Sequence, residues 1–515
     1  MTTIQTTENE RREWIIPVGL AGGSAILLGW NLGARTLADF DEAIYAEIAR
    51  EMTRDRSWIV LHFNYAPWYQ KPPLLMWIQA VLFQIFGASD VAARMPSLVA
   101  GACLVSLTYV IARRYLEWQA ALLSALVLVG CYQFVAAARF ATTDMLLTLF
   151  IYLQVWAYLR VREGDERSWF IAGAAAGLGI MTKGAAGLTG PLILVVALAA
   201  DRKLGAACRG RTVWLAAALT LTIALPWHVL ALASGGRAFL DDYVGYHLLR
   251  RTTQPIEGHE GSVLTYFAYI RNQFFPWAYL ALFAVPAHAY RWYRHRDVSS
   301  VLLATVLVVL LLYTGVQTKL VWYILPVYPA LAIVTASVLW RAAVGGRFEL
   351  ALVAAAGILG ALLIPHQFIT YPRSWAYGYL AALALVGLVF LALRKRQRGA
   401  AVVAVLTVGF FAGASLYRDI ALYSPDSPAI VTVARAAHGG TPRPLGVLIN
   451  DKRLMLDTPV WPDLLWYSDR PLVTIEGSTP IGGISDFVLA DSSVPGLRTV
   501  FVYEGYAYAT TTAAP

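Results

Sequence analysis

The stretch MPSLVAGACLVSLTYVIARR, residues 95–114, is a long apolar run that ends in the pair Arg113 and Arg114. At about 1.5 Å per residue, its apolar part is about 27 Å long as a helix, close to the thickness of the hydrocarbon core of a bilayer. Basic residues collect in cytoplasmic loops of membrane proteins. The stretch therefore predicts a transmembrane helix whose arginine end faces the cytoplasm.

The whole chain has the composition of this stretch. Its 515 residues are 58% hydrophobic and only 14% charged, whereas soluble proteins carry about 25% charged residues. The 17 Trp and 27 Tyr suit helices with aromatic ends. This composition excludes a disordered, collagen-like or disulfide-stapled protein. Cys103, Cys131 and Cys208 form no CxxC pair, so we expect neither disulfides nor a zinc site of that kind.

The sequence predicts a polytopic α-helical membrane protein with about thirteen spans. The expected spans are residues 14–33, 95–112, 119–137, 145–160, 169–182, 187–200, 212–232, 276–292, 299–315, 321–340, 348–364, 375–393 and 400–416. We interpret the first as an uncleaved signal anchor, preceded by Arg11 and Arg12. With the N-terminus inside, the loops richest in Lys and Arg are cytoplasmic and the C-terminus lies outside. The net charge of +9 is thus an orientation signal, and we expect no nucleic acid as partner.

Residues 34–94 form a first outer loop that is too long for a plain connector. Phe40, Ile44, Tyr45, Ile48 and Met52 recur at helical spacing and predict an amphipathic helix on the membrane surface. The run LLMWIQAVLFQIF, residues 74–86, is apolar all round but too short to span. We expect a second in-plane helix there.

The tail has a different pattern. We divide the chain into a transmembrane part, residues 1–416, and a small outer α/β domain, residues 417–515. The stretches VLIN, PLVTIEG, DFVLAD and TVFVYEGYAY predict short strands, and PVWPDLLWYSD predicts a helix or turn.

Charges of both signs fall at the outer ends of the expected spans. Acids lie at the start of the first outer helix and at the mouth of the fourth span: Asp39, Asp41, Glu42 and Asp144. Cations fall at the same level: Lys71, Arg94, Arg139, Lys183, Arg250, Arg251 and Lys319. Snorkelling explains any one of these cations, and capping of the helix explains Asp39. The whole set indicates a site for an anionic lipid headgroup beside a catalytic acid.

A series of motifs carries a family resemblance. In order they are FDEAIYAEIAREM, KPPLLMW, ARMPS, ARFATTDM, MTKG, DDYVGYHLLRRTTQPIEGHEG, FFPW and KLVWYILPVYPALA. Together they resemble the polyprenyl-phosphate-sugar glycosyltransferases of the GT-C superfamily, and within it the branch of the protein O-mannosyltransferases and the lipid A aminoarabinose transferases. The resemblance spans residues 14 to about 340 and includes the tail only loosely.

The resemblance implies roles for single residues. Asp41 would be the catalytic carboxylate on the acceptor side, and Asp144 a second acid of the active site. The donor's phosphate or sugar would be bound by residues of the other motifs: Lys71, Arg250, Arg251, Lys319, Tyr323, Glu42, Tyr69 and His247. Which of the two adjacent arginines faces the site stays open, because neighbouring helical residues point about 100° apart.

A cofactor stays open as well. The aminoarabinose transferases commonly carry Glu where this chain has Gln70. The loss of one carboxylate weakens a divalent-cation site, so the resemblance leaves a metal held by Asp144 and His247 as an open alternative. No other cofactor is expected.

The expected function is that of an inverting glycosyltransferase in the bacterial inner membrane. It would move a hexosyl or pentosyl group from undecaprenyl phosphate to lipid A, a polysaccharide or another envelope acceptor on the periplasmic face, and we expect a monomer. Protein O-mannosylation is one alternative, although the chain lacks the large repeat insertion that eukaryotic-type enzymes usually carry. A lipid flippase or transporter is the alternative of a different class, but such proteins place their charges near the midplane rather than at one face.

The orientation can be tested with a reporter. We expect a reporter fused after residue 420 to be active only outside the cytoplasm, because an odd number of spans puts the tail opposite the N-terminus. A reporter fused after residue 203 serves as the cytoplasmic control. A cytoplasmic signal at residue 420 would overturn the thirteen-span topology.

Overall fold

The computed structural model describes residues 2–38, 40–255, 259–274, 277–295, 300–363, 428–438, 444–449, 462–476, 484, 486–489, 497–503 and 506–511. These residues fold into two compact units. Unit 1 comprises residues 1–30, 70–72 and 97–421, and unit 2 comprises residues 31–69, 73–96 and 422–515. The expected spans 375–393 and 400–416, like Asp39, lie outside the described residues.

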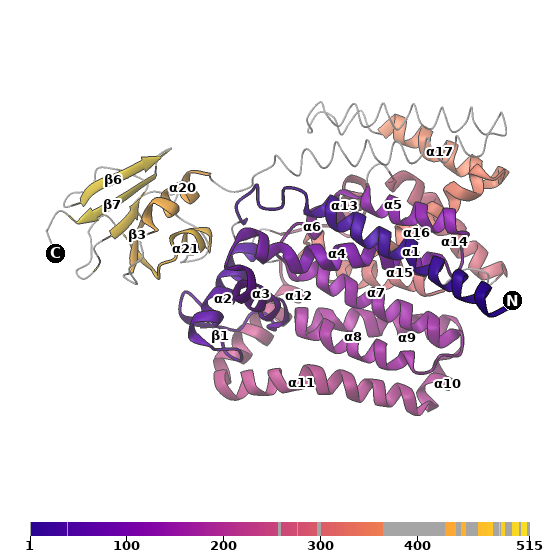
Figure 1. Cartoon of the computed structure of the whole chain (residues 1–515), viewed down its shortest axis with the longest axis horizontal. Helices are drawn as coiled ribbons and strands as arrows, with labels where there is room; N and C mark the ends of the chain where they lie inside the picture. The colour runs from indigo at the N-terminus through magenta and orange to yellow at the C-terminus, as the bar shows by residue number, and fades with distance from the viewer. Residues whose placement is uncertain are drawn as a thin grey trace. The chain divides into compact units, whose positions relative to one another are not determined.

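Unit 1 is helical, and helical segments cover most of each expected span up to residue 363 (Figure 1). Its first half consists of α1 (Thr2–Gly29), most of α4 (Asp90–Ala112), α5 (Trp118–Val129), α6 (Tyr132–Ala138), α7 (Thr143–Arg162), α8 (Ser168–Lys183), the 3₁₀ turn η1 (Gly184–Leu188), α9 (Thr189–Ala200), α10 (Leu204–Arg209) and α11 (Arg211–Phe239). Its second half consists of the π-helix η2 (Leu240–Arg250), α12 (Arg251–Thr253), α13 (Thr265–Gln273), α14 (Ala278–His295), α15 (Ser300–Gly315), the 3₁₀ turn η3 (Val321–Ile324), α16 (Val327–Ala343) and α17 (Arg347–Leu363).

Among the described residues, four helical segments are long and apolar enough to cross a membrane, or up to six if two bent pairs each count as one span. One bent pair is α5 with α6, at 70°. The stretch 168–200 is a single segment by the same measure, although η1 interrupts it. The thirteen-span count therefore remains a prediction.

Glycine sets the closest helix contact in unit 1. A Cβ on Gly173 of α8 would lie 2.3 Å from the carbonyl oxygen of Ala216 in α11. One turn further along α8, a Cβ on Gly177 would lie 2.8 Å from the Cβ of Ile223. The hydroxyl of Thr220 donates to the carbonyl of Gly173 at 2.8 Å. This small-xxx-small spacing brings two backbones together where lipid offers no hydrophobic drive for helices to associate.

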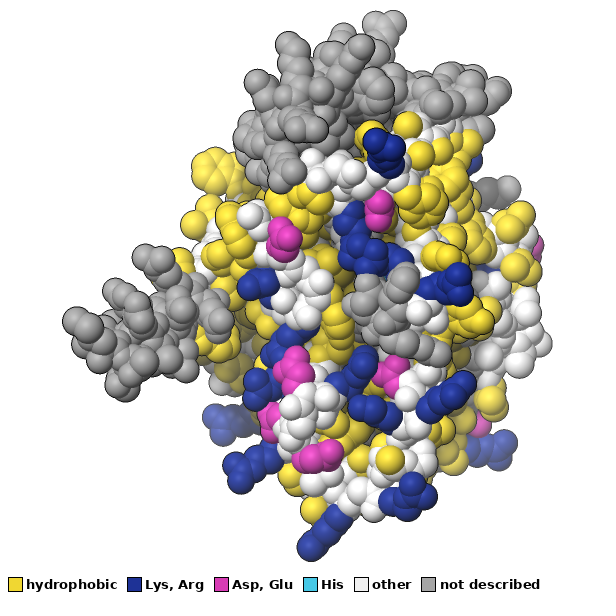
Figure 2. Space-filling view, turned by 90° about the vertical axis from the view of Figure 1, so that its right-hand side faces the viewer, with side chains coloured by type: hydrophobic (Ala, Val, Ile, Leu, Met, Phe, Trp, Pro, Cys, Tyr) yellow, Lys and Arg dark blue, Asp and Glu magenta, His cyan; other side chains and the backbone are white. Residues whose placement is uncertain are grey.

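One end of unit 1 is basic. The arginines Arg113 and Arg114 follow α4, Arg160 and Arg162 end α7, and Arg209 and Arg211 flank the turn before α11. Figure 2 shows many Lys and Arg side chains, with fewer acids among them, on the side of the molecule where α10 and the N-terminus lie in Figure 1. This is the distribution that the positive-inside rule associates with a cytoplasmic face.

Unit 2 joins the first outer loop to the tail. The loop contributes α2 (Asp41–Asp55), β1 (Leu61–Phe63), β2 (Ala66–Trp68) and α3 (Leu74–Phe86). The tail contributes α20 (Pro428–Ala437), β3 (Leu445–Ile449), α21 (Pro462–Ser468), β4 (Leu472–Glu476), β5 (Asp486–Leu489), β6 (Leu497–Tyr503) and β7 (Tyr506–Thr511). The helices α2 and α3 occur where the sequence predicts them, while the short antiparallel pair β1–β2 was not predicted.

The tail forms a mixed five-stranded sheet of order β4-β3-β5-β7-β6. Strand β3 pairs in parallel with β4 and β5, and β7 pairs antiparallel with β5 and β6. Buried apolar residues of α20, α21 and the strands form its core, including Val433, Leu464 and Val488. Phe63 of β1 packs against this core, so the loop takes part in it.

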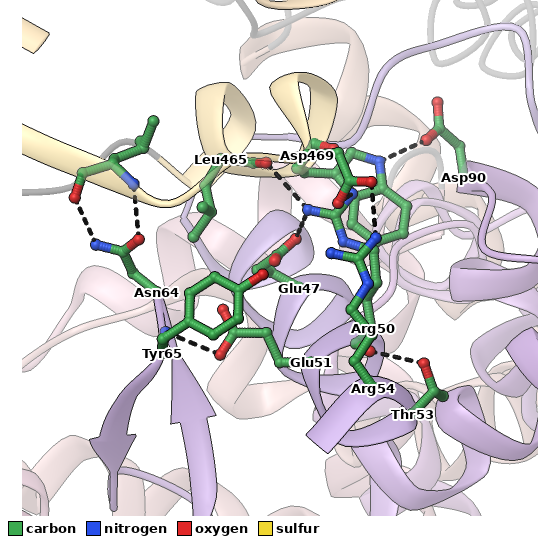
Figure 3. Close-up of polar contacts among 12 residues, drawn as sticks. Glu47, Arg50, Glu51, Thr53, Arg54, Asn64, Tyr65, Asp90, Leu465 and Asp469 are labelled. Atoms are coloured by element: carbon green, nitrogen blue, oxygen red, sulfur yellow. Dashed lines mark hydrogen bonds and ion pairs between the residues drawn. The ribbon is translucent and has the colours of Figure 1, made fainter. Parts of the chain in front are cut away.

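The polar side of α2 is not in water, contrary to the amphipathic interpretation. Glu47 and Glu51 are 1% and 0% exposed, and Arg50 is 8% exposed. Figure 3 shows Arg50 directed at α21 with Glu47 beside it, and Glu51 next to Tyr65. Arg50 donates to the carbonyls of Trp466 at 2.8 Å and Leu465 at 3.0 Å, and pairs with Glu47. A helix from residue 41 and a helix 400 residues later therefore bury each other's polar groups.

Asp469 completes this interface. It forms an ion pair with Arg50 at 3.0 Å and accepts a hydrogen bond from Arg54 at 2.7 Å (Figure 3). These two guanidinium groups hold the pKa of Asp469 below its usual range even though burial opposes them. Arg50 also lies 4.8 Å from the centre of the Trp466 ring, a cation–π distance. The contact supplies charge partners for a face of α2 that could not otherwise be buried.

Glu51 makes the stability of unit 2 depend on pH. Burial, and then the charge of Glu47, raise its pKa from 4.5 to about 8. One of its oxygens accepts from the backbone of Tyr65 at 3.0 Å, and the other is buried without a hydrogen-bond partner among the described residues. A carboxyl with a raised pKa favours the folded state when protonated, and this stabilisation is lost as pH rises from 4.5 towards 8.

We therefore expect unit 2 to lose stability between pH 5 and pH 8, by up to about 1.4 kcal/mol per pH unit for one such carboxyl. Glu51→Gln, which cannot ionise, should reduce this dependence, and Glu47, whose pKa burial raises to about 7, should account for the rest. Hydrogen–deuterium exchange of residues 462–469 in the full chain, corrected for the intrinsic effect of pH, measures it. Asp55→Asn, an exposed acid of the same helix, should leave the dependence in place. An unchanged slope in Glu51→Gln would contradict the assignment.

Candidate active site

A break in the helical chain positions the first group of site residues, in unit 1. Helix α8 ends at Lys183, and Gly184 follows at φ 57°, a conformation that side chains rarely adopt. The 3₁₀ turn η1 then leads into α9. A Cβ on Gly187 would lie 2.3 Å from the backbone nitrogen of Ile180, so η1 folds tightly against α8. The break leaves Lys183 at a helix end inside the bundle.

Lys183 lies in a buried pocket of one acid and several aromatic rings. Its ammonium is 2.5 Å from a carboxylate oxygen of Asp144, at the start of α7, and both side chains are almost fully buried. The same ammonium lies 5.1 Å from the centre of the Tyr323 ring. The ring of Tyr313 lies 5.2 Å from that of Tyr323. The arrangement presents a cation to an anionic ligand and an aromatic wall to a sugar or lipid.

A second group of charges lies on η2. The imidazole of His247 is 3.6 Å from a carboxylate oxygen of Asp242 and has Lys71 and Arg251 as electrostatic neighbours. The π-helix also touches the break after α8, because a Cβ on Gly184 would lie 2.4 Å from the hydroxyl of Tyr243. The structure therefore brings η2 beside the turn that presents Lys183. π-Bulges occur often at functional sites.

The two adjacent arginines have different surroundings. Arg251 is half-buried and interacts with His247, whereas Arg250 is mostly exposed and lies 5.7 Å from the Tyr246 ring. Of the pair that the sequence leaves open, Arg251 thus belongs to the charged group around His247.

Asp41 begins α2 in unit 2, where a carboxylate favours the positive end of the helix. It is half-buried, and the described residues offer its carboxylate no hydrogen-bond or ion-pair partner. Phe40 before it has φ 68° and ψ −124°, a strained backbone for a residue with a side chain. Asp41 is therefore an acid whose acceptor capacity is unused. Tyr69, the other expected residue of unit 2, is 8% exposed.

Glu42 has a structural role at the start of α2, and its part in ligand binding stays a prediction. Its two oxygens accept from Nε and Nη2 of Arg94, each at 2.9 Å. One of them also accepts from the backbone of Ala38 at 2.8 Å. Glu42 is 1% and Arg94 4% exposed. A buried carboxylate held in this bidentate manner has little capacity left for a ligand.

Lys319 also has a structural role, and its contact with the donor stays a prediction. Its ammonium donates to the carbonyls of Tyr313, Thr314 and Val316 at the end of α15. A lysine has three N–H donors, and three acceptors satisfy them. Lys319 is 3% exposed and closes the helix end.

The described residues do not assemble the metal site that the sequence left open. They contain no group of three His, Cys, Asp or Glu side chains placed to hold an ion. Asp144 is neutralised by Lys183, and His247 faces two cations. We therefore assign no step to a metal ion.

The sequence missed two features of the site. Lys183 was only one of several outer cations, although the motif MTKG and the interrupted apolar run marked it. Tyr313, whose hydroxyl is 3.4 Å from that of Thr189, carried no signal beyond its place in an apolar span.

Comparisons with known proteins find relatives in sequence and in fold. The family model described as dolichyl-phosphate-mannose-protein mannosyltransferase matches residues 70–229. The crystal structure of ArnT from Cupriavidus metallidurans bound to undecaprenyl phosphate superposes with a TM-score of 0.76 at 22% identity, over 98% of both chains. The chain has the GT-C fold of ArnT. The family resemblance inferred from the motifs is thereby confirmed.

Curated relatives and a second structure extend the likeness. An undecaprenyl phosphate-α-4-amino-4-deoxy-L-arabinose arabinosyl transferase from Erwinia tasmaniensis is 29% identical over 59% of this chain and 56% of its own length. One from Sodalis glossinidius is 27% identical over 72% and 69%. The chain thus spans just over half the length of the first relative and about two thirds of the other. The apo crystal structure of the oligosaccharyltransferase from Archaeoglobus fulgidus also superposes on this chain, with a TM-score of 0.53 at 13% identity over 92% of this chain and 69% of that chain.

The Lys183–Asp144 pair can be tested by its stability. Lys183→Met leaves a buried carboxylate without a counter-charge, and we expect a loss of about 3–5 kcal/mol. The double variant Lys183→Met/Asp144→Asn removes both charges and should recover most of that loss. Thermal unfolding in detergent measures both. Lys203→Met, at an exposed lysine before α10, is the matched control and should change little. A double variant no more stable than Lys183→Met would show that the two charges do not depend on each other.

Proposed function

We propose that this protein is an inverting glycosyltransferase that takes a sugar from undecaprenyl phosphate and attaches it to lipid A or another envelope acceptor at the periplasmic face of the inner membrane. The observation that carries the proposal is the buried Lys183 beside Tyr323, next to the π-helix η2, which holds His247 and is followed directly by Arg251. Such a group of cations and aromatic rings suits a lipid-linked phosphate and its sugar. The undecaprenyl-phosphate aminoarabinose transferases among the relatives, and the undecaprenyl phosphate bound to ArnT, support the same donor.

The proposed reaction is one displacement at the anomeric carbon. An oxygen of the acceptor forms the new bond to that carbon as the bond to the polyprenyl phosphate oxygen breaks. The electron pair goes to the departing phosphate, whose negative charge Lys183, Lys71 and Arg251 stabilise. Asp41 orients the attacking oxygen and accepts its proton where it carries one. The anomeric configuration inverts because there is a single in-line step.

Asp144 has a supporting part in this proposal. It holds Lys183 at 2.5 Å and so fixes the ammonium in the pocket below Tyr323. The donor phosphate then meets a cation that is already oriented, which lowers the reorganisation that binding requires. Tyr69 is proposed as a further contact of the donor.

Protein O-mannosylation remains the second candidate, because the matching family model carries that description. The relatives named as aminoarabinose transferases cover more of the chain than the 160 residues of that model. A flippase is less well supported, because the curated relatives compared above are named as transferases.

Asp41 provides the direct test. We expect Asp41→Asn to lower kcat by about 10²–10⁴ fold, the usual contribution of a positioned acid or base, with the protein folded and donor binding retained. Asp55→Asn removes an exposed carboxylate from the other end of α2 and should keep full activity. The assay uses the purified full chain with undecaprenyl-phosphate aminoarabinose and lipid A. Transfer by Asp41→Asn at the wild-type rate would refute the role of Asp41, and no transfer by wild type with a panel of undecaprenyl-phosphate sugars would refute the function.

A further inference from the structure

The segment before Asp41 has no regular secondary structure, yet several of its backbone groups are hydrogen-bonded to side chains. The carbonyls of Leu32 and Arg35 accept from Nη1 of Arg94 at 2.9 Å each, and that of Thr36 accepts from Nη2 at 2.8 Å. The N–H of Ala38 donates to Glu42. Buried backbone groups need such partners when no helix or sheet supplies them.

A further hydrogen-bond partner of this segment comes from the tail. The N–H of Leu37 donates to the hydroxyl of Tyr467, in α21, at 2.7 Å. The same hydroxyl donates to a carboxylate oxygen of Asp90 at 2.9 Å. The indole of Trp466 donates to the other oxygen of Asp90 at 3.0 Å, as Figure 3 shows. Asp90 opens α4, which one turn later carries Arg94.

These bonds join into one network. Arg94 and Asp90 lie one turn apart on α4. Arg94 binds carbonyls of residues 32–36, and Asp90 accepts from the Tyr467 hydroxyl that holds the amide of Leu37. Tyr467 is the link between this network and the tail, and it stands 430 residues from its partner Leu37. Arg50 in turn fixes the backbone on either side of Tyr467, through the carbonyls of Leu465 and Trp466 and the side chain of Asp469.

The geometry points to Tyr467 as a positioning residue for Asp41: its hydroxyl, supplied by the tail, holds the strained segment that presents the proposed catalytic carboxylate. The inference rests on the proposed function, because Asp41 matters only if it takes part in transfer. The strained backbone of Phe40 explains why this segment needs to be held by its neighbours. A backbone conformation of this kind persists only where its surroundings over-determine it, and Leu37 lies three residues before Phe40.

Through Tyr467 the tail contributes to the transfer reaction. Tyr467 touches neither donor nor acceptor in this proposal and acts through the backbone of Leu37. Loss of its hydroxyl leaves the Leu37 amide and one oxygen of Asp90 each without a partner, which costs about 1–3 kcal/mol for each buried group. That cost falls on the segment before Asp41, so the carboxylate samples other positions and its effective concentration at the reacting oxygen drops.

The test is Tyr467→Phe in the purified full chain, with Tyr508→Phe as control. Both variants lose one phenolic hydroxyl from the tail, but Tyr508 lies on β7, away from residues 31–40 in the sheet pairing, and packs against the core of the tail. We expect Tyr467→Phe to lower kcat about tenfold with an unchanged KM for the donor. Tyr508→Phe should keep the wild-type kcat. Equal kcat values for Tyr467→Phe and wild type would overturn the proposal.

A merely structural role is separated by two further measurements. The double variant Asp41→Asn/Tyr467→Phe should be no slower than Asp41→Asn, because Tyr467 acts through Asp41; multiplicative losses would overturn the positioning role. Hydrogen–deuterium exchange should rise in residues 31–38 of Tyr467→Phe and not of Tyr508→Phe. Unchanged exchange there would overturn the proposed anchoring even if the transfer assay fails, so this result is distinct from a failure of the proposed function.

Discussion

A buried guanidinium must find an acceptor for each of its five N–H donors, and Arg94 meets this constraint in full. It has two bonds to Glu42 and three to carbonyls of the segment that precedes α2. The acids and bases of α2 obey the same rule through Arg50 and the carbonyls of α21. Removal of one partner from such a pair is far more damaging than replacement of both. The course of the chain around Asp41 is thus set by the need to satisfy buried charges more than by apolar packing.

The sequence predicted what depends on local pattern. Apolar runs located the helices of unit 1, and the spacing of Ile44, Ile48 and Met52 located α2. The strands of the tail also form where alternation and turn residues placed them. The motifs identified the GT-C fold, because eight of them in order constrain a chain more than any one of them does.

What the sequence could not supply is the partner of each charged residue. Glu42, Lys319 and Arg94 look alike as charges near expected outer span ends, but Glu42 and Arg94 form a buried pair and Lys319 closes a helix end. From the sequence alone, Glu47 and Arg50 are expected to face solvent. The helix that buries them, α21, lies more than 400 residues later in the chain. Lys183 could be recognised as a site residue only once the break at Gly184 placed it beside Asp144 and Tyr323. Pairings over such separations do not follow from periodicity, which reports only neighbours within a few turns.

Unit 2 is built from residues 31–69 and 73–96 together with residues after 422. During synthesis the first of these segments emerges long before its other half, with all of the intervening helices still to be made. In that interval Glu47 and Arg50 lack the carbonyls of α21, and the Leu37 amide lacks Tyr467. The outer unit is therefore among the last parts of the molecule to be completed, and a chain that stops short of the tail would hold a finished helical bundle with its proposed catalytic acid on an unfinished support.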